Sequence, residues 1–372
     1  MKAQALYITY RLWALLLMVG LCACDPWEQP EEETDVSLTI FKEFWGQMDQ
    51  HYTCFAEHPV NWDSVYYTHI NQVAEMQDPD ELIPILQSIV NTLKDPQIEI
   101  ISHGDKPYIH YFPSGYDPND GRKDPKIPTA GTDYALYNEN WAHNIHTFSF
   151  SHKRENKDYH FLYIEARNFK KGGAINYHMR LDSLISSSSD CQGIIVDLRD
   201  NYTGEIEMMM EFARQFYEGD SPFIQTARRE SKVDRREMTS LKPLSVIGTG
   251  TIPNDIPIVV LVNYLTFGPA NICAYILQAQ KNVIVIGLMP SSGGGSSVSG
   301  VTLTHNWRLR FSNDVKYYVN RRSCEYPIPL NMVVNESGVI EERFEIDGQK
   351  QHLYLSAPFA TAISLLESLS QK

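Results

Sequence analysis

The sequence predicts a mixed α/β protein whose central sheet is built mostly from parallel strands. Three mostly apolar runs of strand length carry this prediction: residues 193–199 (GIIVDLR), 257–264 (PIVVLVNY) and 282–288 (NVIVIGL). Segments with helical periodicity, EIEMMMEFARQFY and PANICAYILQAQ, follow the first two runs. Apolar strands that alternate with helices are typical of parallel sheets covered on both faces.

Hydrophobic patterns divide the rest of the chain. Residues 36–96 carry apolar side chains at helical spacing and predict a small helical module. Residues 97–160 predict a β-rich connector, with alternating segments around a loop dense in Pro, Gly and Asp and a hairpin that turns near residues 155–157. Residues 161–372 are the predicted α/β core, which ends in an amphipathic helix, APFATAISLLESLSQ.

The first 24 residues, MKAQALYITYRLWALLLMVGLCAC, place two basic residues before an apolar run and a few small residues. This order predicts a signal peptide over residues 1–23, since the apolar run is too short to span a membrane comfortably. The last four letters resemble the lipobox of bacterial lipoproteins, in which Cys24 would carry the lipid. A plain secretory signal with cleavage nearby is the alternative.

Residues 24–35 are acidic, contain Pro and predict a flexible tether. A lipid anchor followed by this tether would hold the protein at a membrane of the bacterial cell envelope. The outer membrane is favoured, and display on its outer surface stays open. The net charge of −14 becomes −16 once the two basic residues of the signal are removed. This charge argues against nucleic acid as a partner, because phosphate binding needs clustered Lys and Arg.

Four cysteines follow the tether: Cys54, Cys191, Cys273 and Cys324. Their spacing contains no CxxC pair and the histidines form no HExxH, so neither a metal nor another cofactor is expected. Disulfides are allowed in an exported protein, and their pairing stays open. Cys273 lies among apolar residues of a predicted helix and is expected to be a packed thiol.

The order of the segments resembles the tail-specific, or C-terminal-processing, serine peptidase family and its tricorn-like branch. The segment LKDPQIEI is similar to the family's Leu-x-Asp-Gly-His, and GIIVDLRDNYTG resembles Asp-Leu-Arg-x-Asn-x-Gly-Gly. The segments LVNYLTFGPANICA and VIGLMPSSGGG resemble the nucleophile segment and the Gly-rich loop that follows it. The resemblance implies a crotonase/ClpP-like core. Residues 97–160 leave too little room for the full PDZ domain of many members.

Catalytic positions of the family are changed in this chain. The resemblance aligns the nucleophilic Ser with Gly268, the His base with Gln97 and the Glu of the tricorn-like tetrad with Glu325. Gly268 has no Oγ, and the side chain of Gln97 takes no proton at neutral pH. The Gly-rich loop also lacks the Lys that serves as base in the other branch. The resemblance therefore implies a degenerate peptidase.

The resemblance also implies a cleft for an extended polypeptide, which would bind beside the core sheet through main-chain hydrogen bonds. The peptide and oxyanion positions fall on Thr203, Gly204, Gly268, Pro269 and Ala270. Thr203 replaces the first Gly of the family's pair. The helix N-terminus at Pro269 would suit a carboxylate, including a peptide C-terminus. The expected function is binding of a peptide or of a protein partner.

Two alternative functions stay open. The first is an active serine peptidase with a relocated nucleophile, Ser291 or Ser292. Its base would come from one of three histidines: His103, His110 or His305. The second is a structural or assembly lipoprotein without a peptide site. Asp197 and Arg199 are expected to form a structural ion pair and not to take part in chemistry.

Overall fold

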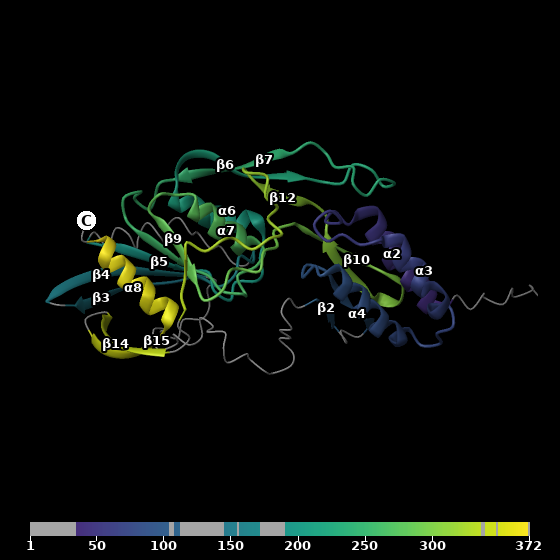
Figure 1. Cartoon of the computed structure of the whole chain (residues 1–372), viewed down its shortest axis with the longest axis horizontal. Coiled ribbons are helices and arrows are strands. Elements are labelled where there is room, and N and C mark those ends of the chain that lie inside the picture. The colour runs from purple at the N-terminus through teal and green to yellow at the C-terminus, as the bar shows by residue number, and fades with distance from the viewer. Residues whose placement is uncertain are drawn as a thin grey trace, which may run out of the picture.

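The computed structural model describes residues 35–103, 108–111, 145–154, 156–171, 190–335, 339–346 and 349–370. The predicted signal peptide, Cys24 and the tether up to residue 34 lie outside these residues, as does most of the connector loop. Figure 1 shows two lobes, one with α2, α3 and α4 and the other with α6, α7 and α8. No helix in the described ranges is both long and apolar enough to cross a membrane.

The larger lobe is built on an eight-stranded sheet with the order β13-β9-β8-β5-β4-β3-β14-β15. The strands from β13 to β4 are parallel to one another, and β3, β14 and β15 add antiparallel pairs. The fold is therefore mixed α/β with mostly parallel strands, as the sequence predicts. The bounds are Ile145–Arg154 (β3), Lys157–Ala166 (β4), Gly193–Asp197 (β5), Ile258–Leu261 (β8), Val283–Gly287 (β9), Met332–Val333 (β13), Val339–Ile346 (β14) and Gln349–Ser356 (β15).

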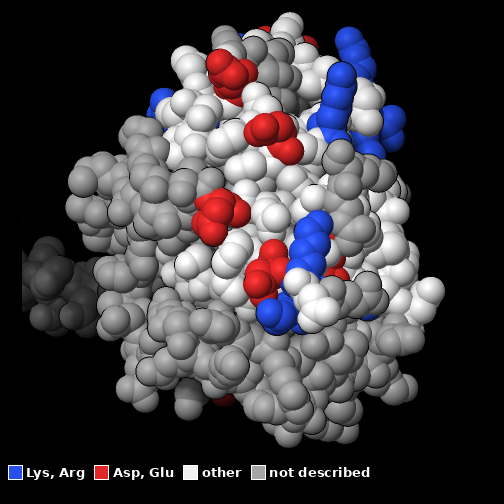
Figure 2. All heavy atoms as spheres, turned by 90° about the vertical axis from the view of Figure 1, so that its left-hand side faces the viewer, with Lys and Arg blue, Asp and Glu red and all other residues white. Residues whose placement is uncertain are grey.

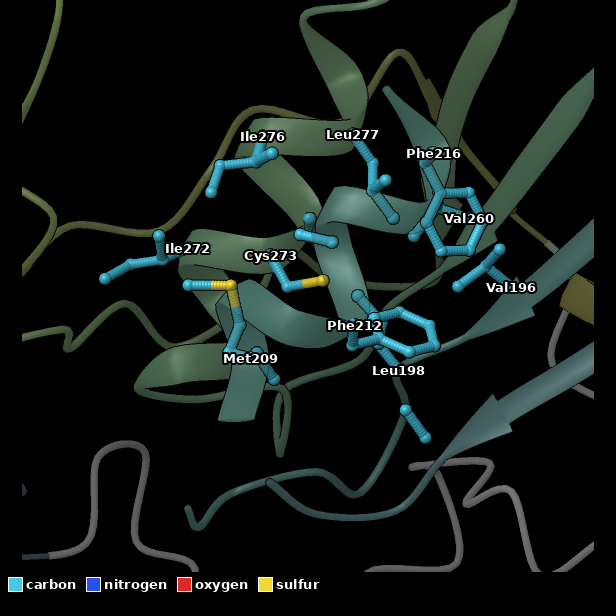
Figure 3. Close-up of a cluster of buried hydrophobic side chains, with 14 of the residues drawn as sticks. Val196, Leu198, Met209, Phe212, Phe216, Val260, Ile272, Cys273, Ile276 and Leu277 are labelled. Carbon is cyan, nitrogen blue, oxygen red and sulfur yellow. The ribbon is translucent and has the colours of Figure 1, made fainter. Parts of the chain in front are cut away.

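Helices cover both faces of this sheet. On one face, α6 (Ile206–Ala213) and α7 (Pro269–Gln278) bury Phe212 and Cys273 against Val196 and Val260 (Figure 3). On the other, α8 (Ala357–Leu369) packs Phe359 with residues from the alternate positions of β5 and β8. Successive side chains of a strand point to opposite faces, so a sheet covered on both faces needs apolar residues throughout. This explains the apolar runs.

The smaller lobe begins with three helices: α2 (Val36–His51), α3 (Trp62–Val73) and α4 (Leu82–Leu93), the last preceded by the 3₁₀ turn η1 (Pro79–Glu81). The side chain of Asp35 accepts a hydrogen bond from Leu38 N at 2.9 Å and caps α2. Asn61 caps α3 in the same way, by accepting a hydrogen bond from Ser64 N at 3.1 Å. The helices bury an aromatic core.

The smaller lobe is completed by late segments of the chain. Its sheet has the order β10-β11-β1-β2, and Leu309 of β11 lies opposite Ile100 of β1. Trp307 and Leu309 are buried in the same apolar core as the helices. The strands are β1 (Glu99–Ile101), β2 (Tyr108–His110), β10 (Val298–Thr302) and β11 (Arg308–Ser312), with the 3₁₀ turn η6 (Thr304–Asn306) before β11. This pairing brings the end of α4 beside residues that follow the Gly-rich loop.

A third sheet, β12-β6-β7, lies along the top of Figure 1. Its strands are β6 (Glu218–Ala227), β7 (Lys242–Thr249) and β12 (Val315–Tyr318), and the 3₁₀ turn η5 (Arg214–Phe216) precedes β6. Arg235, from the segment between β6 and β7, forms ion pairs with Asp49 at 2.5 Å and Asp63 at 2.6 Å. These contacts attach the β6–β7 segment to α2 and α3.

Charged side chains of both signs lie on the surface, and the four described cysteines are free. Figure 2 shows one face, on which several basic side chains of the described residues lie together at the upper right and acidic side chains lie through the middle, with further basic ones beside them. Cys54, Cys191, Cys273 and Cys324 are free thiols. Cys273 is buried, and burial raises the pKa of its thiol, as expected of a packed thiol.

Candidate active site

Gly268 forms the turn between β8 and α7. Its backbone has φ 61° and ψ −126°, a conformation that glycine adopts without a steric penalty. The Gly268 N–H donates to the carbonyl of Gly293 at 2.9 Å. A Cβ placed on Gly268 would meet no atom within 4 Å. The position that the resemblance aligns with the family's nucleophile is thus a tight turn with open space and no functional group.

The next residues of α7 are poor donors. Pro269 has no backbone N–H, and the N–H of Ala270 donates to the carbonyl of Phe267 at 3.3 Å. An oxyanion site needs N–H groups that point at the developing charge. Pro269 therefore supplies no donor, and the Ala270 N–H is already used within the turn. The carboxylate site expected at this helix N-terminus thus lacks both of these donors.

The loop after β5 lies against the same turn, because Phe267 N–H donates to the carbonyl of Asn201 at 2.9 Å. Within this loop, Gly204 has φ 147°, and a Cβ there would lie 2.4 Å from the carbonyl carbon of Phe169. The N–H of Phe169 donates to the carbonyl of Thr203 at 2.9 Å. Gly204 is therefore needed for a close backbone approach, and Thr203 is fixed by that same bridge.

Gln97 follows α4 and is buried. Its N–H donates to Asp95 Oδ1 at 2.7 Å, and its side-chain Nε2 donates to Glu325 Oε2 at 3.1 Å and to Ser312 Oγ at 2.9 Å. The structure thus brings together the two residues that the resemblance aligns with the family's base and its Glu.

Glu325 follows β12 and is buried near a second carboxyl group, that of Asp95. Its Oε1 accepts hydrogen bonds from Ser296 Oγ at 2.5 Å and Ser296 N at 3.1 Å. Burial and the nearby charge of Asp95 raise the pKa of Glu325 to about 8. Asp95 is also buried and accepts a hydrogen bond from Tyr52 O–H at 2.8 Å. Burial, with the charge of Asp95, raises the pKa of Tyr52 and keeps it a donor.

The Gly-rich loop connects the two halves of the site. The carbonyl of Gly293 accepts the Gly268 N–H, and Gly294 N–H donates to the carbonyl of Glu325 at 3.3 Å. A Cβ on Gly293 would lie 2.2 Å from the Glu325 carbonyl oxygen. The turn at Gly268 and the segment of Glu325 are therefore joined through the main chain of the Gly-rich loop.

The alternative nucleophiles are engaged elsewhere. Ser291 is buried, donates to Asn271 Oδ1 at 2.6 Å and accepts from Ile328 N at 3.0 Å. Ser292 donates to the carbonyl of Tyr264. Neither hydroxyl contacts a His, Lys or carboxylate among the described residues. No base is thus in place beside either one.

The three candidate histidines lie in the smaller lobe. His103 approaches Asp80 at 3.6 Å, and its ring centroid is 4.9 Å from that of His305. His110 bonds to the carbonyl of Ile98 at 3.1 Å. These contacts lie within the smaller lobe, and no hydrogen bond found among the described residues joins one of these histidines to Ser291 or Ser292.

A serine–lysine pair exists elsewhere, and sequence reasoning missed it. Lys316 Nζ donates to Ser297 Oγ at 2.8 Å, but it also donates to Asp314 Oδ1 at 2.8 Å and Oδ2 at 3.0 Å. All three oxygen atoms therefore accept a hydrogen bond from an amine that is buried and ion-paired. A lysine held in this way does not abstract the hydroxyl proton of Ser297.

The predicted ion pair between Asp197 and Arg199 is confirmed. Arg199 Nε donates to Asp197 Oδ1 at 2.9 Å, and both side chains are buried at the end of β5. Tyr163 O–H donates to the same carboxylate at 2.9 Å, and Arg199 also donates to Ser356 Oγ at 2.7 Å. These contacts join β4, β5 and β15, so the pair has a structural role.

Sequence reasoning missed several residues of the site. His58, Asp95, Ser296 and Ser312 surround the Gln97–Glu325 contact. Asp95 was visible as the Asp of LKDPQIEI, two residues before Gln97. The others come from distant segments, and no local motif marks them. His58, Asp95 and Glu325 are the described residues whose arrangement could hold a metal ion.

In this fold Gly268 forms the turn before α7 and Gln97 contacts Glu325, at the positions that the resemblance aligns with the family's nucleophile, base and Glu. Residues 160–331 match the model of peptidase family S41, and residues 38–91 match that of the tricorn protease C1 domain. The two matches together span more than half of the chain. These matches support the chain's membership of the tail-specific, S41, peptidase family. No curated protein matches the chain.

Solved structures show the same fold. A candidate peptidase from Parabacteroides merdae has a TM-score of 0.66 and 22% identity, and the match covers 80% of this chain and 89% of that one. Mature CPAF complexed with lactacystin has a TM-score of 0.60 and 8% identity, covering 90% and 98%. A lipoprotein from Streptococcus agalactiae has a TM-score of 0.52 and 15% identity, covering 89% and 96%.

Proposed function

We propose that this protein is a degenerate peptidase that binds an extended polypeptide or a protein partner and performs no hydrolysis. The observation that carries the proposal is the turn at Gly268. Acyl transfer needs a nucleophilic oxygen, a base beside it and donors for the oxyanion. Gly268 offers no oxygen, Gln97 offers no base, and Pro269 offers no N–H. Because the parts of such a site act together, the loss of even one removes most of the rate.

Binding would not need any of these groups. The space beside Gly268 is open, and the main chain around it is held by the Gly293 and Asn201 carbonyls. Large apolar side chains are exposed on the loops that form the site. They are Tyr202 (61% exposed), Met289 (43%) and Tyr326 (47%). Aromatic and Met side chains of this kind are common anchors for peptide partners.

The proposed location follows from the N-terminal sequence. LCAC resembles a lipobox, so Cys24 would anchor the protein in a membrane of the bacterial cell envelope, with the outer membrane favoured. The acidic tether would let the peptide site reach polypeptides near that membrane. No nucleic acid partner is proposed, given the net charge of −14.

A peptide library tests this function. Fluorescently labelled peptides of varied sequence and both free and blocked C-termini are titrated with the purified mature protein, and anisotropy is measured. We expect saturable binding that weakens at least about tenfold in Tyr202→Ala or Tyr326→Ala, since anchor residues contribute more than about 1 kcal/mol. Tyr67→Ala, an exposed tyrosine of α3, is the matched control and should bind normally. Absence of saturable binding across the library would favour an assembly lipoprotein without a peptide site.

A further inference from the structure

Three residues from separate segments converge beside the Gln97–Glu325 contact. His58 lies in the segment after α2, Asp95 follows α4, and Glu325 follows β12. One ligand atom from each lies within 4.8 Å of the other two. The backbone of His58 is fixed, since its N–H donates to the carbonyl of Cys54 at 2.8 Å.

Among the described residues, no Lys or Arg balances the two carboxyl groups of this cluster, so either a proton on Glu325, whose pKa is raised to about 8, or a bound cation has to take that role. Both Asp95 and Glu325 are buried. The Nε2 atom of His58 and the Oε2 atom of Glu57 are buried and make no hydrogen bond. Buried charges in proteins are paired or coordinate a metal, because an isolated ionised group is costly to remove from water.

From this geometry we propose that His58, Asp95 and Glu325 bind a divalent transition-metal ion of the zinc class. One imidazole nitrogen and two carboxylate oxygens suit zinc and its neighbours, whereas calcium and magnesium favour oxygen ligands alone. Three such atoms around a tetrahedral zinc lie about 3.4 Å apart, so small side-chain rotations close the cluster. A neutral imidazole and two carboxylates balance the charge of the ion, and a water or Glu57 can fill the fourth position.

The surrounding hydrogen bonds support this assignment. Tyr52 donates to Asp95, while Ser296 and Gln97 donate to Glu325, so both carboxylates are already oriented by groups outside the ligand set. The ion would tie together the segments after α2, α4 and β12. The sequence shows no metal motif because these ligands are 37 to 267 residues apart along the chain.

Metal titration tests the proposal. The purified mature protein is stripped with a chelator and titrated with Zn²⁺ by calorimetry and with Co²⁺ by visible absorption. We expect one ion per chain, with affinity lowered at least about tenfold in His58→Gln and in Glu325→Gln. His69→Gln, a partly exposed histidine of α3, is the matched control and should bind as the unchanged protein does. Thermal unfolding of each variant shows whether it is folded.

Two results would overturn the proposal. One is the absence of stoichiometric binding by the unchanged protein, which would leave a proton on His58 or Glu325 as the counter-charge. The other is binding that both variants retain in full. If either variant does not fold, Cu²⁺ bound to the unchanged protein reports the imidazole through nitrogen hyperfine coupling in its electron paramagnetic resonance spectrum. A spectrum without that coupling contradicts the site.

Discussion

The side-chain amide of Gln97 donates a hydrogen bond to the carboxylate of Glu325 at 3.1 Å, although the two residues are 228 positions apart. This contact links the end of α4 in the smaller lobe to the segment after β12. An amide that donates to a carboxylate stabilises the local fold but moves no proton. The contact therefore holds the polar side chains of the site in place, and Gln97 itself provides no base.

Gly204 should tolerate no side chain. Gly204→Ala would place a Cβ 2.4 Å from the carbonyl carbon of Phe169 at a φ of 147°. We expect a loss of about 2–4 kcal/mol in the free energy of unfolding, measured by urea denaturation. Gly46→Ala in α2 is the control, since a Cβ there meets nothing within 4 Å and should stabilise the helix by about 0.5–1 kcal/mol. Equal stabilities of the two variants would contradict the proposed backbone contact.

His110 should make stability fall in mild acid. Burial lowers the pKa of His110 from its usual 6.5, despite its bond to the Ile98 carbonyl and the charges of Glu99 and Asp95. The unfolded chain therefore takes up the proton first as pH drops below about 6.5, and this favours unfolding. The contribution of neutral His110 to the free energy of unfolding is therefore fully present above about pH 6.5. It is lost as the pH falls toward the lower pKa that His110 has in the folded protein.

His110→Asn, which can keep a donor toward Ile98, should flatten this dependence in urea denaturation between pH 5 and 7.5. His305→Asn changes an exposed histidine and serves as the control. An unchanged slope in His110→Asn would show that other groups cause the dependence.

Cys24 should determine membrane attachment. In cells, the unchanged protein should partition into the detergent phase of a Triton X-114 extract and incorporate a labelled fatty acid. Cys24→Ser should move it to the aqueous phase, because the lipid chains supply the membrane affinity. Cys22→Ser, one of the residues removed with the signal, should leave partition unchanged. Fatty-acid labelling that persists in Cys24→Ser would contradict the lipobox assignment.

Local patterns in the sequence predict the core well. The apolar runs at β5, β8 and β9 lie in the parallel part of the sheet, and the hairpin near residue 155 pairs Arg154 with Lys157. Apolar strands and helical periodicity depend on near neighbours, so they can be read without tertiary information. The Asp197–Arg199 pair was predictable for the same reason.

Long-range pairings could not be predicted in this way. The sheet that completes the smaller lobe pairs Ile100 with Leu309, and nothing near either residue marks its partner. His58 likewise reaches Asp95 and Glu325 only through the tertiary fold. The resemblance to the family identified Gln97 and Glu325. Only the geometry of the turn shows that Pro269, which has no N–H, stands at the first position of α7, where a donor to an oxyanion would be needed.

Fluorophosphonate labelling of the purified mature protein tests most directly whether the site has lost its chemistry. We predict that the unchanged protein is not labelled. Gly268→Ser should be labelled at no more than about a hundredth of the rate of an active serine peptidase, because an oxyanion donor and a base are also missing. Adding Pro269→Ala and Gln97→His to Gly268→Ser should allow labelling at residue 268. Labelling of the unchanged protein at any single serine would contradict the account and identify an active peptidase.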